Sequence, residues 1–203
     1  MQDKPTRITF AERVHRDYTV RIARPITEAD DFDDELQLLQ MAQPGDSILF
    51  QLVTPGGNLD TANLICKAIS ESPARTRAFI GSTCASAGTA IALACDEWEL
   101  DENSSFMIHT ASFGSVGKAP ELHSHTEHTL RMIDRWVRNT YTGFLTEDEI
   151  ERVIDGRDMY FEGEELVERL ERYALARDIA MGLVEDEEEE IPQKPVDIEE
   201  DGA

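Results

Sequence analysis

Three residues in this sequence are of the types that work together when a side chain attacks a carbonyl group. Ser86 lies in the small-residue run Ala85-Ser86-Ala87-Gly88, His109 follows a short apolar segment, and Asp158 precedes an aromatic pair. A serine hydroxyl becomes a useful nucleophile when a base takes its proton, and a carboxylate can orient that base. Together, Ser86, His109 and Asp158 could carry out acyl transfer.

A glycine pair could stabilise the negative charge that forms during such a reaction. Gly56-Gly57 ends an apolar segment and precedes a segment with helical periodicity. Backbone N–H groups near a helix N-terminus stabilise an anion, and the missing Cβ lets a substrate carbonyl come close. The N–H that follows Ser86 would point at the same spot, as it does in a nucleophile elbow.

Each of these features alone has a commoner structural explanation. Glycine pairs end strands for conformational reasons, and an isolated serine before a helix is usually an N-cap. A single histidine at a strand end is more often a hydrogen-bonded packing residue, and Asp158 could be an acid at a helix N-terminus. Only the combination favours a catalytic site.

The elements that must position these residues alternate between strand and helix. Short apolar segments at 48–53, 77–80 and 105–108 predict buried strands, and the last ends at His109. Helical spacing at 59–69, a small-residue run at 87–95 and a segment from Pro120 to Thr142 predict helices, and 164–180 predicts another. This alternation predicts an α/β fold with a mostly parallel inner sheet.

Composition narrows the function classes. The chain has 203 residues, 40% hydrophobic, with a formal net charge of −23, which disfavours binding to nucleic acid or to an anionic membrane surface. No apolar run is long enough to span a membrane, the start does not resemble a signal peptide, and three cysteines without a CxxC motif suggest a reducing compartment. We therefore expect a soluble cytoplasmic protein.

Three polar clusters invite other interpretations. Residues 185–203 hold ten acids and one lysine, which predicts a disordered acidic tail that serves solubility or docks a basic partner. The acids between Glu28 and Glu35 suit a helix start better than a metal site. The histidines His123, His125 and His128 are expected on an exposed helix face rather than around a metal.

In combination, the motifs resemble ClpP, the proteolytic subunit of the Clp protease. That family carries a Ser-Pro-Gly-Gly turn, an Ala-Ser-Met-Gly nucleophile turn, a Met-Ile-His strand end and an Arg-Asp before an aromatic residue. This chain has Thr54-Pro55-Gly56-Gly57, Ala85-Ser86-Ala87-Gly88, Met107-Ile108-His109 and Arg157-Asp158-Met159-Tyr160-Phe161 in the same order. The resemblance covers most of the chain, from about Tyr18 to Val184.

The resemblance implies a ClpP/crotonase fold of stacked ββα units with a protruding handle helix. It implies a serine endopeptidase in which Ser86 attacks, His109 is the base, Asp158 orients the histidine, and the N–H groups of Gly57 and Ala87 hold the oxyanion. It implies no metal or organic cofactor, a peptide or unfolded-protein substrate, a closed homo-oligomer of heptameric rings, and an ATP-dependent unfoldase as partner. The expected divisions are an N-terminal segment 1–17, a peptidase domain 18–184 and a tail 185–203.

Several departures from the family pattern indicate a divergent branch, with a viral origin as one interpretation. Ala87 replaces the usual methionine, no proline follows His109 closely, and the chain between Asp158 and Gly182 is longer than usual. Two rival functions stay open at this point: a crotonase-like acyl-CoA enzyme, and a catalytically silent assembly or adaptor subunit.

Overall fold

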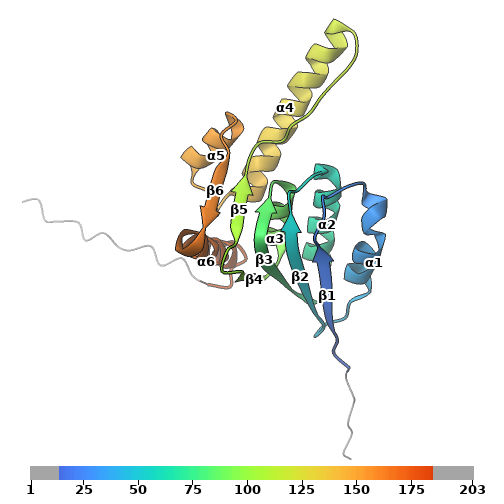
Figure 1. Cartoon of the computed structure of the whole chain (residues 1–203), viewed down its shortest axis with the longest axis vertical. Coiled ribbons are helices and arrows are strands. Elements are labelled where there is room, and N and C mark those ends of the chain that lie inside the picture. The colour runs from blue at the N-terminus through green and yellow to red at the C-terminus, as the bar shows by residue number, and fades with distance from the viewer. Residues whose placement is uncertain (1–13, 185–203) are drawn as a thin grey trace, which may run out of the picture.

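The computed structural model describes residues 14–184, which form a six-stranded sheet with helices packed on it (Figure 1). Five strands run in the order β1 (Asp17–Ile22), β2 (Ser47–Thr54), β3 (Arg75–Ala85), β5 (Ser105–Ile108) and β6 (Met159–Glu162). A sixth strand, β4 (Glu97–Leu100), pairs with β3. All pairings are parallel except that between β5 and β6. The predicted mostly parallel α/β sheet is confirmed.

The helices begin with a short 3-10 turn, η1 (Ala29–Phe32), which leads into α1 (Asp33–Met41). They continue with α2 (Leu59–Glu71), α3 (Ala87–Ala94), α4 (Ala119–Tyr141), α5 (Glu147–Ile154) and α6 (Gly163–Ala180). The predicted helix start after Glu28 is confirmed, because acids occupy the first turns of η1 and α1. The small-residue helix is confirmed too, since seven of the eight residues of α3 are buried.

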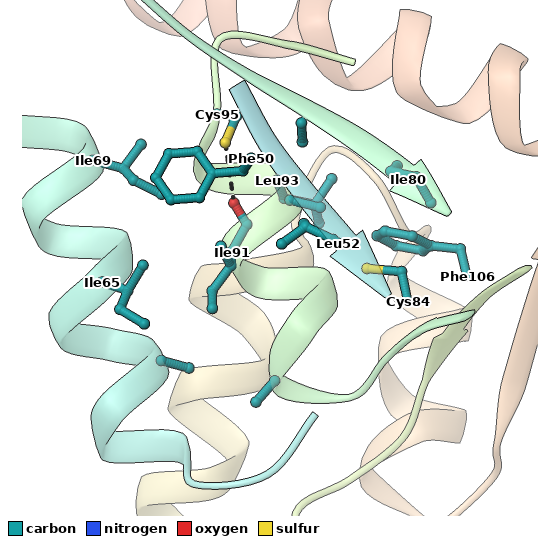
Figure 2. Packing of buried hydrophobic residues seen from close by; sticks show 14 of the residues in the cluster. Phe50, Leu52, Ile65, Ile69, Ile80, Cys84, Ile91, Leu93, Cys95 and Phe106 are labelled. Carbon is teal, nitrogen blue, oxygen red and sulfur yellow. Dashed lines mark hydrogen bonds between the residues drawn. The ribbon is translucent and has the colours of Figure 1, made fainter. Parts of the chain in front are cut away.

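The core lies between the central strands and the helices α2 and α3 (Figure 2). Strand β2 turns Ile48, Phe50 and Leu52 inward, and all three are fully buried. They pack with Ile65 of α2 and with side chains from α3. Because α3 is made of small residues, it can lie close to the sheet, and this fixes where its first turn sits.

The sheet brings the predicted site residues to one edge. Strands β2, β3 and β5 run parallel, so their C-terminal ends lead together to Gly56-Gly57, to Ser86 and to His109. Strand β3 pairs with β4 along 77–80 and then with β5 at Cys84 and Ala85. Ligands of open parallel sheets bind beyond the carboxyl ends of the strands, so this edge is the expected position for a site.

The prediction for Asp158 needs a correction. It was expected before a long helix, but the strand β6 lies between Asp158 and α6. The apolar segment from Met159 to Phe161 pairs antiparallel with β5, with Ile108 opposite Met159. The strands β1, β4 and β6 and the helix α5 are not among the predicted elements, because each is short and charged residues interrupt or bound its apolar positions.

Helix α4 leaves the domain as a long projection (Figure 1). Its base is anchored by Ile133, Val137 and Tyr141, all buried, whereas Leu130 and Met132 are about half exposed. The loop before the helix also exposes Phe113 and Val116. The base of the helix therefore packs on its own domain, whereas apolar side chains farther along it are exposed to solvent.

The remaining predictions meet the structure only in part. The acidic tail and most of the N-terminal segment lie outside the described residues. Within residues 14–184, no helix has the length and hydropathy of a membrane span, and no three acidic, histidine or cysteine side chains are grouped as metal ligands would be. His123 pairs with Glu127 and His125 contacts Thr129, both on the exposed surface of α4.

Candidate active site

Ser86 occupies a strained turn between β3 and α3. Its φ of 53° makes it the only non-glycine residue with positive φ among residues 14–184. It stands at the N-cap position of α3, yet its hydroxyl makes no capping hydrogen bond. The backbone holds it instead: Ser86 N donates to Met107 O of β5 at 2.8 Å, and Thr89 N donates to Ser86 O at 2.9 Å. Strain of this kind is found where a side chain must be presented for function.

Position 56 must be glycine because the turn at Ser86 lies directly against it. A Cβ added to Gly56 would lie 2.5 Å from Ala85 O, 2.7 Å from Ser86 Cβ and 2.9 Å from Ala87 N, and its φ is +85°. Any side chain would therefore displace the nucleophile turn. Thr54 holds the Gly56-Gly57 pair in place. Its hydroxyl accepts from Gly56 N at 3.1 Å and donates to Arg24 O at 2.7 Å.

The backbone directs the Gly57 N–H away from its neighbouring segment. Ile26 bonds the residues on either side of Gly57, with Ile26 N donating to Gly56 O at 2.9 Å and Asn58 N donating to Ile26 O at 2.7 Å. The Gly56 C=O and the Gly57 N–H belong to one trans peptide and point in opposite directions, so the Gly57 N–H points away from Ile26. Gly57 lines the same pocket as Ser86.

Ala87 supplies a second free donor. It is the first residue of α3, and the first N–H groups of a helix have no partner within the helix. The N–H groups of Gly57 and Ala87 therefore remain the predicted candidates for oxyanion donors.

His109 and Asp158 face one another across two strand ends. They extend the β5–β6 register by one position beyond Ile108 and Met159. His109 Nδ1 lies 4.0 Å from Asp158 Oδ1, which is longer than a hydrogen bond, and the side chains are 29% and 53% exposed. Hydrogen bonds of catalytic groups are often long without substrate and tighten when it binds.

A pocket of about 400 Å³ brings three of the predicted site residues together, but neither Ala87 nor Asp158 lines it. Ser86, His109 and Gly57 line it, and Leu59, Ala111 and Trp136 form an apolar wall. A second hollow of about 740 Å³ continues from it along α4 and shares Leu59, Asp60, Ala111, Ser112 and Trp136 with it. The five shared residues show that the two hollows adjoin, with Ser86 in the first of them.

Sequence reasoning missed part of this wall. Trp136 comes from the base of α4, where its Nε1 donates to Asn63 Oδ1 at 2.7 Å, and Asp60 projects from the first turn of α2. The sequence predicts a helix around Trp136 but cannot show which surface that helix meets. The contact between α2 and α4 is a property of the tertiary structure.

The cysteines do not compete with Ser86 as nucleophiles. Cys84 is fully buried in the core beside Phe106, and burial raises the pKa of its thiol far above the ordinary value. Burial also raises the pKa of Cys66 to about 12 and that of Cys95 well above its usual range. Only a thiolate attacks efficiently, so these buried thiols are poor nucleophiles.

Comparison with known proteins finds one matching family profile and several similar Clp protease subunits. The sequence profile described as "NfeD1b, N-terminal domain" matches residues 8–126. The ATP-dependent Clp protease proteolytic subunit 1 of Chlamydia pneumoniae is 30% identical over 156 residues, covering 72% of this chain and 80% of the relative. The subunit of the same name from Chlamydia muridarum is 28% identical, covering 72% and 79%.

A solved structure agrees with these sequence matches. A ClpP1 variant from Listeria monocytogenes superposes with a TM-score of 0.60 at 23% identity, over 74% of this chain and 86% of that one. At this identity the likeness shows the fold, and it confirms the ClpP-like architecture. The relatives named here are bacterial, so they give no support to a viral origin.

Proposed function

Because this chain is a divergent member of the ClpP-like family, we propose that it is a serine endopeptidase that cleaves peptides or unfolded proteins at Ser86. The single observation that carries the proposal is the convergence of Ser86, His109 and Gly57 on one pocket at the carboxyl edge of the sheet. A crotonase-like acyl-CoA enzyme has no need of a strained serine beside a histidine.

The proposed mechanism uses the groups in the order set by their chemistry. His109 takes the proton of the Ser86 hydroxyl as Oγ attacks the peptide carbonyl, and the carbonyl oxygen becomes negatively charged. The N–H groups of Gly57 and Ala87 hold that oxygen. His109 then gives its proton to the leaving amine, while Asp158 fixes the tautomer of the imidazole and stabilises its charged form. Water hydrolyses the acyl-enzyme by the reverse use of the same groups.

The direct test is peptide hydrolysis by Ser86→Ala. We expect the hydrolysis rate to fall by about a million-fold while melting temperature and assembly stay unchanged, because a triad acts as one unit. Ser112→Ala is the matched control, since Ser112 lines the same pocket without a place in the mechanism. Full activity in Ser86→Ala, or acyl-CoA turnover without peptide hydrolysis, would refute the proposal.

The proposal extends to a homo-oligomer, with heptameric rings as the family's usual form. It is supported by the exposed apolar side chains around the outer part of α4, because water-exposed groups of this kind mark interaction surfaces. Relatives are named as ATP-dependent proteolytic subunits, so a partner unfoldase would supply the ATP-driven step in the cytoplasm. This sequence itself has no phosphate-loop lysine motif.

Two substitutions on α4 separate assembly from folding. Leu130 is 54% exposed and Ile133 is 7% exposed on the same helix. We expect Leu130→Glu to leave the folded subunit intact but to lower its mass in sedimentation, and Ile133→Glu to unfold it. A Leu130→Glu protein of unchanged mass and specific activity would show that this surface is not the contact between copies.

A further inference from the structure

A buried chain of hydrogen bonds links the base of α4 to the nucleophile turn. Thr89 Oγ1 donates to Ser86 O at 2.6 Å, and the Tyr141 hydroxyl lies 2.8 Å from Thr89 Oγ1. Both Thr89 and Tyr141 have no exposed surface. Nothing in the proposed mechanism uses either side chain.

The direction of the chain follows from counting protons. A threonine hydroxyl has one proton, and that of Thr89 is used on the carbonyl of Ser86. Tyr141 must therefore donate to Thr89. Burial raises the pKa of the Tyr141 hydroxyl far above its ordinary value, which favours the protonated form that can donate.

The Ser86 carbonyl and the Ala87 N–H belong to the same peptide group. That group is planar and trans, so its C=O and N–H point in opposite directions. With the carbonyl bound by both Thr89 N and Thr89 Oγ1, the plane cannot rotate without breaking two hydrogen bonds. The Ala87 N–H is thereby fixed on the side facing away from Thr89. Gly56 lies on that side, so close that a Cβ added to it would be 2.9 Å from Ala87 N.

We propose that Thr89 and Tyr141 are positioning residues that aim and polarise the Ala87 N–H as an oxyanion donor. Donation to a carbonyl strengthens the N–H of the same peptide, and hydrogen bonds in series reinforce one another. The strained turn at Ser86 needs this support, since its positive φ would otherwise relax. The inference rests on the proposed peptidase function.

Tyr141 also connects this chain of hydrogen bonds to the wall of the pocket. Its ring packs edge-on against Trp136, with centroids 5.6 Å apart, and Trp136 forms a wall of the pocket. One residue at the base of α4 thus contacts both the support of the oxyanion donor and the substrate groove. A change in how α4 packs on the domain therefore affects both the turn at Ser86 and the pocket wall.

The test compares variants that remove single hydroxyl groups. Tyr141→Phe keeps the ring, and we expect it to lower kcat about tenfold with KM within twofold. Its affinity for a peptide aldehyde, whose adduct places an oxyanion in the hole, should fall by the same factor. Thr89→Val, which also loses the bond to the carbonyl, should lose more, and Thr89→Ser should stay within about twofold of wild type.

Tyr173→Phe is the matched control, because Tyr173 is a partly buried tyrosine that packs on Trp98 and Phe144 away from the turn. A kcat for Tyr141→Phe no lower than that for Tyr173→Phe would overturn the proposal, as would unchanged aldehyde affinity. If Tyr141→Phe unfolds, Thr89→Val against Thr89→Ser decides in the same way. A wild-type protein that hydrolyses no peptide would instead refute the proposed function, and this inference with it.

Discussion

The two halves of the candidate site are held very differently. The backbone of the turn at Ser86 is tightly held: the Ser86 N–H donates to β5, Thr89 donates to the Ser86 carbonyl, and Gly56 leaves no room for a methyl group. His109 and Asp158 lie at exposed strand ends, and their closest approach is 4.0 Å. The central strands and α3 thus hold in place the groups that we propose as nucleophile and oxyanion donors.

The difference shows which groups of the proposed site this fold holds rigidly and which it leaves free to adjust. Charge stabilisation depends on fixed N–H groups, and these come from backbone that the core cannot rearrange cheaply. The base and its carboxylate have side-chain freedom and can adjust when substrate covers them. The strongest effects of substitution should therefore fall on the turn, and the weaker ones on the His109–Asp158 side.

Gly56→Ala should give the largest effect of the glycine and carboxylate substitutions. The new methyl group would collide with Ala85 O and Ala87 N, and φ of +85° is strained for alanine. We expect kcat/KM to fall at least about a thousand-fold and stability to fall by about 2–4 kcal/mol, measured by peptide hydrolysis and denaturant unfolding. Gly114→Ala, where an added Cβ meets nothing within 4 Å, is the control. Normal activity in Gly56→Ala would mean that the turn is not tightly held.

Asp158→Asn should have a smaller effect. A buried triad aspartate is worth about ten-thousand-fold in kcat, but Asp158 is half exposed and competes with water for His109, so we expect a loss of about a hundred-fold. Asp155→Asn, a nearby exposed carboxylate, should change kcat less than about twofold. Equal kinetics for the two variants would remove Asp158 from the site. A loss as complete as that of Ser86→Ala would erase the contrast between the two halves.

Glu149→Gln should act mainly on stability, through the helices that flank the Asp158 turn. Glu149 and Arg169, each only 14% exposed, form an ion pair at 2.7 Å that joins α5 to α6, and this pairing lowers the pKa of Glu149 to about 2. Because the folded pKa lies below the unfolded value of 4.5, the stabilisation is complete above about pH 4.5 and is lost as pH falls toward 2.

The Glu149→Gln variant should therefore be less stable than wild type at pH 7 by at most about 3 kcal/mol, and kcat should fall no more than a few-fold. Urea unfolding at a series of pH values measures the gap, which should close as pH falls from about 4.5 to about 2. Glu165→Gln removes a more exposed partner of Arg169 and should cost less than about 1 kcal/mol. A gap for Glu149→Gln that does not change with pH would contradict the ion-pair explanation.

Sequence reasoning predicted the inner part of the fold and missed its periphery. The strand 105–108 matches β5, and the helical patterns of α2, α3 and α4 were found because apolar spacing is clear where an element is buried on one side. The strands β4 and β6 are as short as β5, but their apolar runs are interrupted or ended by charged residues: Glu97 and Glu99 in β4, and Glu162 in β6. Glycines at 156 and 163 flank β6 and were the available signal for a short element there.

The site shows the same division. Ser86, His109 and Gly57 follow strand ends, so their convergence could be anticipated from a parallel sheet. Thr89 and Tyr141 could not, because a threonine inside a helix and a tyrosine 52 residues later give no sign that their hydroxyls meet. Similarly, the half-buried and half-exposed character of α4 depends on where the domain ends, which periodicity does not record.

The most direct measurement of the central claim is covalent labelling with a peptidyl phosphonate, followed by mass spectrometry of the digested protein. Phosphonates react with a serine that a neighbouring base activates, whereas ordinary serines stay unmodified. We expect nearly all of the adduct on Ser86, none on Ser112 of the same pocket, and a much slower reaction in His109→Ala. Absence of an adduct, an adduct on Ser112, or labelling of Ser86 at the same rate without His109 would contradict the account.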